Sequence, residues 1–109
     1  MKLTDKCKTE FEKWWYSKFN PSIDGETHHF IVMIGDKFDD LTNSMQYGVL
    51  VDFFDSVDID ICIYFGDGGG CEVNIYAKKY YALDRNTTRQ EAREQAIVKA
   101  NEIYNVLNK

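Results

Sequence analysis

Hydrophobic residues recur along this chain with two different periods, that of a helix and that of a strand, and the helical period comes first. From residue 4 to residue 19 the apolar positions are spaced by three and four, which places them on one face of an amphipathic helix. We expect Thr4 to cap this helix by accepting a backbone N–H. Asn20-Pro21 predicts its end, because the residue before proline avoids the α region. The apolar positions are Leu3, Cys7, Phe11, Trp14, Trp15 and Phe19.

Two central segments are apolar enough to be buried, and they predict different elements. Residues 28–34 form a short run that closes at a Gly-Asp pair, which is typical of a buried strand. Residues 45–57 fit both the alternation of a strand and the spacing of a helix. We interpret 45–57 as a helix, because residues 42–44 offer three N-caps before it and Asp52 and Asp55 fall opposite its apolar stripe. That stripe is Tyr47, Leu50, Val51 and Phe54.

Strict alternation follows from residue 58 onward and predicts a β-hairpin. Residues 58–65 read as the first strand, the glycine-rich residues 66–70 turn the chain, and the alternation resumes at Cys71. Opposed residues of a hairpin share a face, so Cys62 is expected on the face opposite Cys71, which argues against a disulfide between them. The inward positions are Ile59, Ile61, Ile63, Phe65, Cys71, Val73 and Ile75.

The C-terminal part predicts a further short strand and a long helix. Residues 76–83 are polar and aromatic and favour a strand, and Thr88 with Glu91 forms a capping box before the helix. The predicted order is helix, strand, helix, hairpin, helix. We therefore expect one α+β domain over residues 1–109, with a small antiparallel or mixed sheet and helices on one face. The stripe of the last helix is Ala92, Ala96, Ala100, Ile103 and Leu107.

Composition narrows the class of protein. The 109 residues are 44% hydrophobic and 28% charged, which suits one globular domain. The apolar runs are far shorter than the roughly 20 residues of a membrane helix, and the chain starts with charged sequence instead of a signal peptide. Three cysteines at spacings unlike a zinc site indicate reduced thiols. We expect a cytoplasmic protein without a membrane partner.

Charge is unevenly distributed, and its acidic part is the candidate partner-binding segment. The formal net charge is −5, yet residues 36–67 hold eight aspartates against one lysine, a net charge of −7. Such asymmetry shapes association with charged partners, unless the basic ends of the chain neutralise the acidic middle in the folded protein. The eight residues are Asp36, Asp39, Asp40, Asp52, Asp55, Asp58, Asp60 and Asp67.

Motifs of catalysis or cofactor binding do not emerge from the sequence. His28 and His29 are adjacent on a predicted strand and point to opposite faces, so they do not suit one metal ion. The glycine-rich loop lies between two strands, whereas phosphate-binding loops lead into a helix. Asp58 and Asp60 lack the spacing of a calcium loop. We therefore expect a protein that is not an enzyme and that uses neither a cofactor nor a metal.

Two segments resemble a group of short, uncharacterised bacteriophage and prophage proteins. They are residues 45–56, with the sequence Met-Gln-Tyr-Gly-Val-Leu-Val-Asp-Phe-Phe-Asp-Ser, and the Thr-Arg-Gln-Glu-Ala-Arg and Ala-Asn-Glu-Ile-Tyr-Asn parts of the C-terminal helix. In that group a glycine commonly follows the Ser-Val pair at which this chain has Asp58. The resemblance implies a protein of the bacterial host cytoplasm that acts by binding a host component.

Three functions remain open from the sequence. The first is a counter-defence or host-takeover inhibitor, similar to anti-CRISPR proteins. Its aspartates would take the place of nucleic-acid phosphates on a basic host protein that handles nucleic acid, and the inhibitor itself would not bind nucleic acid. The second is a sponge for a nucleotide signal, formed by aromatic rings and basic residues. The third is a structural or assembly protein of the phage. The basic residues of the second hypothesis are Lys78, Lys79, Arg85 and Arg89.

Adjacent aromatic residues on the first helix predict a contact surface. Trp14, Trp15 and Tyr16 are separated by about 100° on a helix, so all three cannot point into one core. At least one is expected at the surface, where aromatic anchors commonly contribute to interfaces. We consider a homodimer or a partner contact at these rings, with a ring that only caps the core as the alternative.

Overall fold

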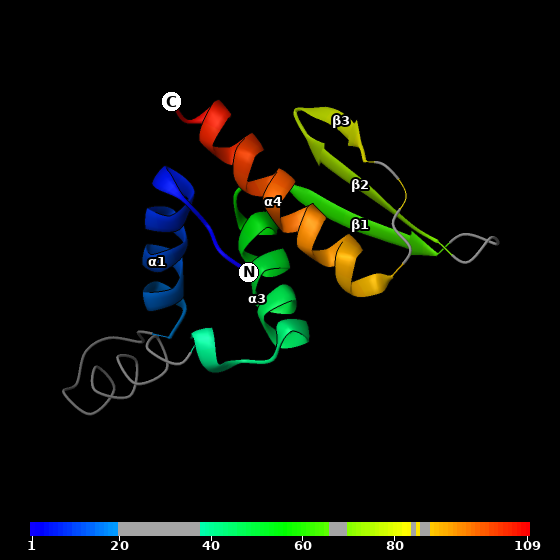
Figure 1. Cartoon of the computed structure of the whole chain (residues 1–109). Coiled ribbons are helices and arrows are strands. Elements are labelled where there is room, and N and C mark those ends of the chain that lie inside the picture. The colour runs from blue at the N-terminus through cyan, green and yellow to red at the C-terminus, as the bar shows by residue number, and fades with distance from the viewer. Residues whose placement is uncertain (20–37, 66–69, 84, 86–87) are drawn as a thin grey trace.

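Helices and an antiparallel sheet make up the structure, a computed structural model that describes residues 1–19, 38–65, 70–83, 85 and 88–109. The α3 and α4 helices lie against one face of the sheet, and α1 lies on the side of these helices away from the sheet (Figure 1). The predicted α+β class is confirmed. In chain order the elements are α1 (Asp5–Phe19), the 3₁₀ helix η1 (Phe38–Asp40), α3 (Asn43–Ser56), β1 (Asp60–Phe65), β2 (Cys71–Ala77), β3 (Lys79–Ala82) and α4 (Arg89–Leu107).

The three strands pair antiparallel in chain order. Ile61 lies opposite Ile75 in the β1–β2 pair, so odd-numbered residues oppose odd-numbered residues, as the alternation predicts. Cys62 therefore belongs to the even-numbered face and Cys71 to the odd-numbered face, and both are free thiols. The short strand predicted after residue 76 is present as β3.

The odd-numbered face of the sheet is the buried one, because α3 and α4 cover it. Val73 and Ile75 are fully buried there, whereas the even-numbered side chains are exposed or half-buried. Phe65, which the alternation predicts to point inward, is 60% exposed at the end of β1, which corrects that prediction. The α4 helix turns its predicted alanine stripe to the core, although Leu107 at the end of that stripe is exposed. Thr88 caps α4 by accepting the Glu91 N–H at 3.1 Å, as predicted. The prediction of helices on one face is confirmed.

The ambiguous segment 45–57 is helical, as we interpreted it. Of the three possible caps, Thr42 is the one that accepts a backbone N–H, from Met45 at 3.3 Å. Phe53 is buried and Val51 is only half-buried, which corrects the predicted stripe. The reason is tertiary, because the ring of Phe11 in α1 packs against Phe53 with centroids 5.3 Å apart.

A buried glutamine holds the turn that precedes α3. The Gln46 Nε2 donates to the carbonyl oxygens of Phe38, Asp39 and Leu41 at 3.2, 3.3 and 3.2 Å, and its Oε1 accepts from the amino group of Met1 at 3.2 Å. Both polar atoms of the amide are therefore paired, which is the condition for burying such a group. One side chain thus ties η1 and the N-terminus to α3.

The aromatic residues of α1 serve mainly the core. Trp15 is 6% exposed, Trp14 is half-buried with its ring centroid 5.7 Å from that of Phe53, and Tyr16 is 42% exposed. The prediction that these three rings cannot share one core is therefore confirmed. The ring that reaches the surface is the tyrosine, whose hydroxyl group is compatible with water.

The start of α1 is capped by α4, which corrects the prediction that Thr4 caps it. The Cys7 N–H donates to Asn105 Oδ1 at 2.9 Å, and the Thr4 N–H donates to Asn101 Oδ1 at 2.9 Å. The Thr4 hydroxyl accepts from the Nδ2 atoms of the same two asparagines at 3.0 and 3.3 Å. Two asparagines one turn apart on α4 therefore fix the position of α1.

Several sequence predictions lie outside the described residues. They concern the end of the first helix at Asn20-Pro21, the strand over 28–34 with His28 and His29, and the turn at residues 66–69. In the described part of the chain, no helix is both long enough and apolar enough to cross a membrane.

Candidate partner-binding surface

Four of the eight predicted aspartates gather where α3 passes into β1. Asp52 and Asp55 lie on the last turns of α3, Asp58 lies in the connection, and Asp60 begins β1. All four side chains are exposed. We call this group, Asp52, Asp55, Asp58 and Asp60, the acidic end of α3.

Two carboxylates of the acidic end, those of Asp52 and Asp60, repel the carboxylate of Asp55. Partial burial raises the pKa of Asp55 above its ordinary value, and the negative charges of Asp60 and Asp52 raise that pKa further. Among the described residues, none of the four carboxylates forms an ion pair with a lysine or an arginine. Asp52 and Asp55 also lie near the helix C-terminus, where the helix dipole disfavours negative charge. The acidic end is therefore a concentration of charge that the described part of the fold leaves uncompensated.

Asp58 adds a conformational cost to this arrangement. Its φ is 64°, in the left-handed region that favours glycine. The Asp58 N–H donates to the carbonyl of Asp55 at 3.2 Å and the Ile59 N–H donates to that of Phe54 at 2.9 Å. This hydrogen-bond pattern is the Schellman motif, in which the residue at the position of Asp58 is usually glycine.

The two other predicted aspartates in the described residues, Asp39 and Asp40, are not part of this group. Asp39 and Asp40 lie on η1, before the N-terminus of α3, whereas Asp52 and Asp55 lie on the last turns of this helix, whose 14 residues span about 20 Å. Asp36 and Asp67 fall outside the described residues. Of the six predicted aspartates within the described residues, the structure thus brings four together.

A row of tyrosines on the even-numbered face of the sheet was missed by the sequence analysis. Tyr64, Tyr76 and Tyr80 project from three adjacent strands on the side away from the helices. The rings of Tyr76 and Tyr80 have centroids 4.9 Å apart, and the Tyr80 hydroxyl donates to Asn74 Oδ1 at 2.6 Å. A hydrogen bond with Cys62 raises the pKa of the Tyr64 phenol. The signal in the sequence was the tyrosines at the outward positions of the alternating strands.

The row of tyrosines lies next to the acidic end on the surface of the sheet. Asp60 lies directly opposite Tyr76, and Tyr64 lies directly opposite Glu72. We call the exposed set Asp60, Tyr64, Glu72, Tyr76 and Tyr80 the tyrosine face. It shares Asp60 with the acidic end.

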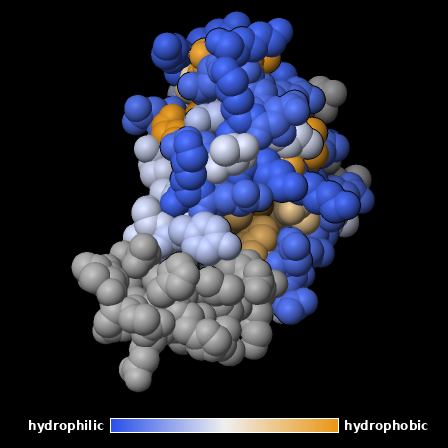
Figure 2. Space-filling model, turned by 90° about the vertical axis from the view of Figure 1, so that its left-hand side faces the viewer, coloured by the Kyte–Doolittle hydropathy of each residue, from blue (hydrophilic) through white to orange (hydrophobic). Residues whose placement is uncertain are grey.

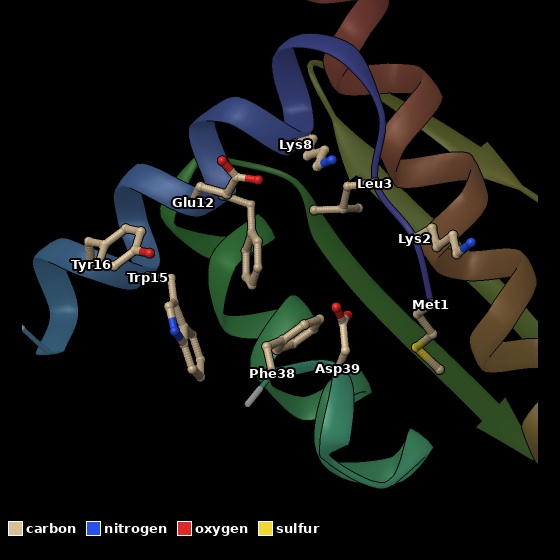
Figure 3. Close-up of a pocket in the computed structure, with 10 residues that line it drawn as sticks. Met1, Lys2, Leu3, Lys8, Glu12, Trp15, Tyr16, Phe38 and Asp39 are labelled. Atoms are coloured by element: carbon tan, nitrogen blue, oxygen red, sulfur yellow. The ribbon is translucent and has the colours of Figure 1, made fainter. Parts of the chain in front are cut away.

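The basic residues expected to hold a nucleotide lie apart from the cavity beside α1. A cavity of about 500 Å³ opens between the N-terminus, α1 and η1, and Figure 3 shows Lys2 and Lys8 at its edge together with Glu12 and Asp39. None of Lys78, Lys79, Arg85 and Arg89 lines it. Two of them lie over aromatic rings in other parts of the molecule. The Arg89 guanidinium is 4.4 Å from the centroid of the Phe65 ring, and Lys79 Nζ is 5.3 Å from the centroid of the Tyr81 ring.

Nucleophilic and metal-binding groups are sparse in the part of the chain that the structure describes. Burial raises the pKa of the Cys7 thiol to about 12, which keeps it protonated. The described residues contain no group of three histidine, cysteine or acidic side chains placed to hold a metal ion. The thiol of Cys62 is half-buried on the tyrosine face.

The side of the molecule formed by α1 is mainly hydrophilic in its described part, with small hydrophobic areas (Figure 2). Large exposed apolar patches usually mark interfaces between proteins. Of the aromatic residues predicted to form an interface, Tyr16 is the one that is exposed. The homodimer therefore stays a prediction.

Comparisons with known proteins add no family to this description. No family model matches the chain. No curated protein and no solved structure matches it either. The resemblance to phage proteins stays a prediction.

Proposed function

We propose that this protein acts by binding, and that its acidic end occupies a basic surface with which another protein holds nucleic acid. The role is that of a counter-defence inhibitor of the anti-CRISPR kind, in which carboxylates replace phosphates. Phosphate contacts dominate the affinity of proteins for nucleic acid, so a surface that offers negative charge competes directly for the same lysines and arginines.

The observation that supports this proposal is a cluster of exposed like charges where α3 ends and β1 begins. Asp52 and Asp60 raise the pKa of Asp55, and Asp58 occupies a left-handed position where glycine is preferred. Asp52 and Asp55 also oppose the helix dipole. A basic partner would relieve each electrostatic penalty, so binding accounts for residues that folding alone disfavours.

The same charges argue against nucleic acid as the partner. Four uncompensated carboxylates repel phosphates, and an interface for nucleic acid requires a basic surface. The separation of Asp52 and Asp55 by three helical residues corresponds to a rise of about 4.5 Å. This rise is of the same order as the about 3.4 Å between successive charges along one strand of a duplex.

The test compares two charge-matched variants as baits in a nuclease-treated bacterial lysate. The first variant is Asp52→Asn, Asp55→Asn and Asp58→Asn, and the control is Asp39→Asn, Asp40→Asn and Glu12→Gln, which removes three charges near η1 and α1. We expect the first variant to lose the captured basic proteins and the control to retain them. Capture by the wild type should weaken as salt rises from about 0.05 to 0.5 M. Equal capture by all three proteins would refute the proposal.

The second step tests the competition itself. A captured protein should bind labelled nucleic acid less tightly when this protein is added, and the three-asparagine variant should have no such effect. Simultaneous binding of nucleic acid and this protein to the partner would show that the acidic end does not take the place of phosphates.

A further inference from the structure

We infer that the tyrosine face binds arginine side chains of the partner, in preference to lysine. This inference rests on the proposed function and adds to it the part of the surface, and the residue type, that provide specificity. It follows from how the strand register places rings and carboxylates beside one another.

The register places a tyrosine directly across from each carboxylate of the face. Asp60 lies opposite Tyr76 in the β1–β2 pair, and Glu72 lies opposite Tyr64. Directly opposed side chains on antiparallel strands have Cβ atoms about 4.5–5.5 Å apart. The third ring, Tyr80, lies opposite Tyr76 on β3. Two carboxylate and ring pairs therefore lie on one surface.

This combination suits a guanidinium group better than an ammonium group. A guanidinium is planar, so it stacks on an aromatic ring while its N–H groups bind a carboxylate in a bidentate manner. A lysine ammonium is a compact, strongly hydrated charge that cannot do both. The acidic end by itself attracts both cations, whereas the tyrosine face discriminates between them.

The face is accessible in the described part of the molecule. Tyr64, Tyr76 and Tyr80 are 51%, 48% and 51% exposed, because the helices lie on the opposite side of the sheet. The described residues with this orientation on the strands include two acids and no lysine or arginine, since Lys79 has the opposite orientation. Charge complementarity therefore favours a cationic protein segment over a nucleic acid.

The experiment titrates the full chain with fluorescent oligoarginine and oligolysine peptides of equal length and measures anisotropy. We expect the wild type to bind oligoarginine about two- to fivefold more tightly than oligolysine, the range given by a cation–π contact. The variant Tyr76→Leu with Tyr80→Leu should bind both peptides equally. The control Tyr16→Leu, which removes an exposed tyrosine on α1, should keep the preference.

The outcomes separate this inference from the proposed function. Equal binding of the two peptides by the wild type would overturn the inference and leave the proposed function standing. Binding of neither peptide would refute both. A preference for arginine that persists without Tyr76 and Tyr80 would also overturn the inference, because the selectivity would then come from elsewhere.

Cys62 provides a readout that needs no substitution. Its thiol is half-buried on the even-numbered face between Asp60 and Tyr64, whereas Cys7 and Cys71 are buried in the core. We expect saturating oligoarginine to slow the alkylation of Cys62 several-fold, as followed by peptide mass spectrometry. Unchanged alkylation at saturation would place the peptide elsewhere and overturn the inference.

Discussion

Replacement of Asp58 by glycine should stabilise the protein. Asp58 has a φ of 64° at the C′ position of a Schellman motif, and its N–H and that of Ile59 both close the end of α3. The left-handed conformation costs a residue with a Cβ about 1–2 kcal/mol, and glycine avoids this cost. The substitution also removes one negative charge from the acidic end.

The expected gain is smaller than the relieved strain, because glycine also loses more conformational freedom on folding. That entropic loss is about 0.5–1 kcal/mol. Removal of the negative charge of Asp58 lowers like-charge repulsion and adds about 0.2–0.5 kcal/mol to the free energy of unfolding. The net expectation for Asp58→Gly is a gain of about 1 kcal/mol in the free energy of unfolding, or a rise of about 4 °C in Tm.

The assay is urea unfolding at low and high salt with three variants at this position. Asp58→Asn removes the charge and keeps a side chain that tolerates the left-handed region, so it should gain only the electrostatic part, and high salt should abolish that gain. Asp58→Ala removes the charge but tolerates the conformation poorly, so it should be no more stable than the wild type. If Asp58→Asn gained as much as Asp58→Gly, charge and not backbone conformation would be the cause.

Three further predictions follow from the polar contacts. Asn105→Ala should lower the free energy of unfolding by about 1–2 kcal/mol in urea titrations, because the Cys7 N–H loses its acceptor; an unchanged midpoint would contradict the capping role. Gln46→Leu should cost about 2 kcal/mol in the same titration, because three carbonyl groups lose their donor, and equal stability would show that water replaces it. The raised pKa of Asp55 means that the folded state binds the proton of this carboxyl group more tightly than the unfolded chain does. Protonation of Asp55 therefore favours folding at low pH, and this contribution to stability is lost as the pH rises from 3.8 through the pKa of the folded state. Asp55→Asn should therefore gain stability relative to the wild type between about pH 3 and pH 7, and a constant difference would refute the shift.

Local interactions explain the parts of the fold that the sequence predicted. Thr88 and Glu91 are three residues apart, and their capping contact requires no distant residue. The pairing of odd-numbered residues in the hairpin follows from the two-residue period of a strand. Alternation also placed Asp60 on the outward side of β1. Each of these features depends on neighbours within a few residues or across one turn.

Long-range contacts decided what local patterns left open. The cap of α1 comes from Asn105, which is 98 residues from Cys7, and no local pattern near Thr4 identifies it. Phe53 takes the core position predicted for Val51, because the ring of Phe11 from another helix packs against it. Gln46 lies outside the predicted apolar stripe and is nevertheless buried, because its hydrogen-bond partners belong to η1 and the N-terminus.

The candidate surface likewise has one feature that the sequence predicts and others that tertiary packing decides. The sequence alone determined that aspartates accumulate between residues 36 and 67, because charge is a property of composition. Which of them act together depends on where α3 ends and how β1 leaves it, and this geometry unites Asp55 with Asp60 while Asp39 lies near the other end of α3. The tyrosine face exists only because three strands pair in one register while α3 and α4 lie on the opposite side of the sheet. Proximity of side chains from separate elements is set by packing, which the one-dimensional pattern does not contain.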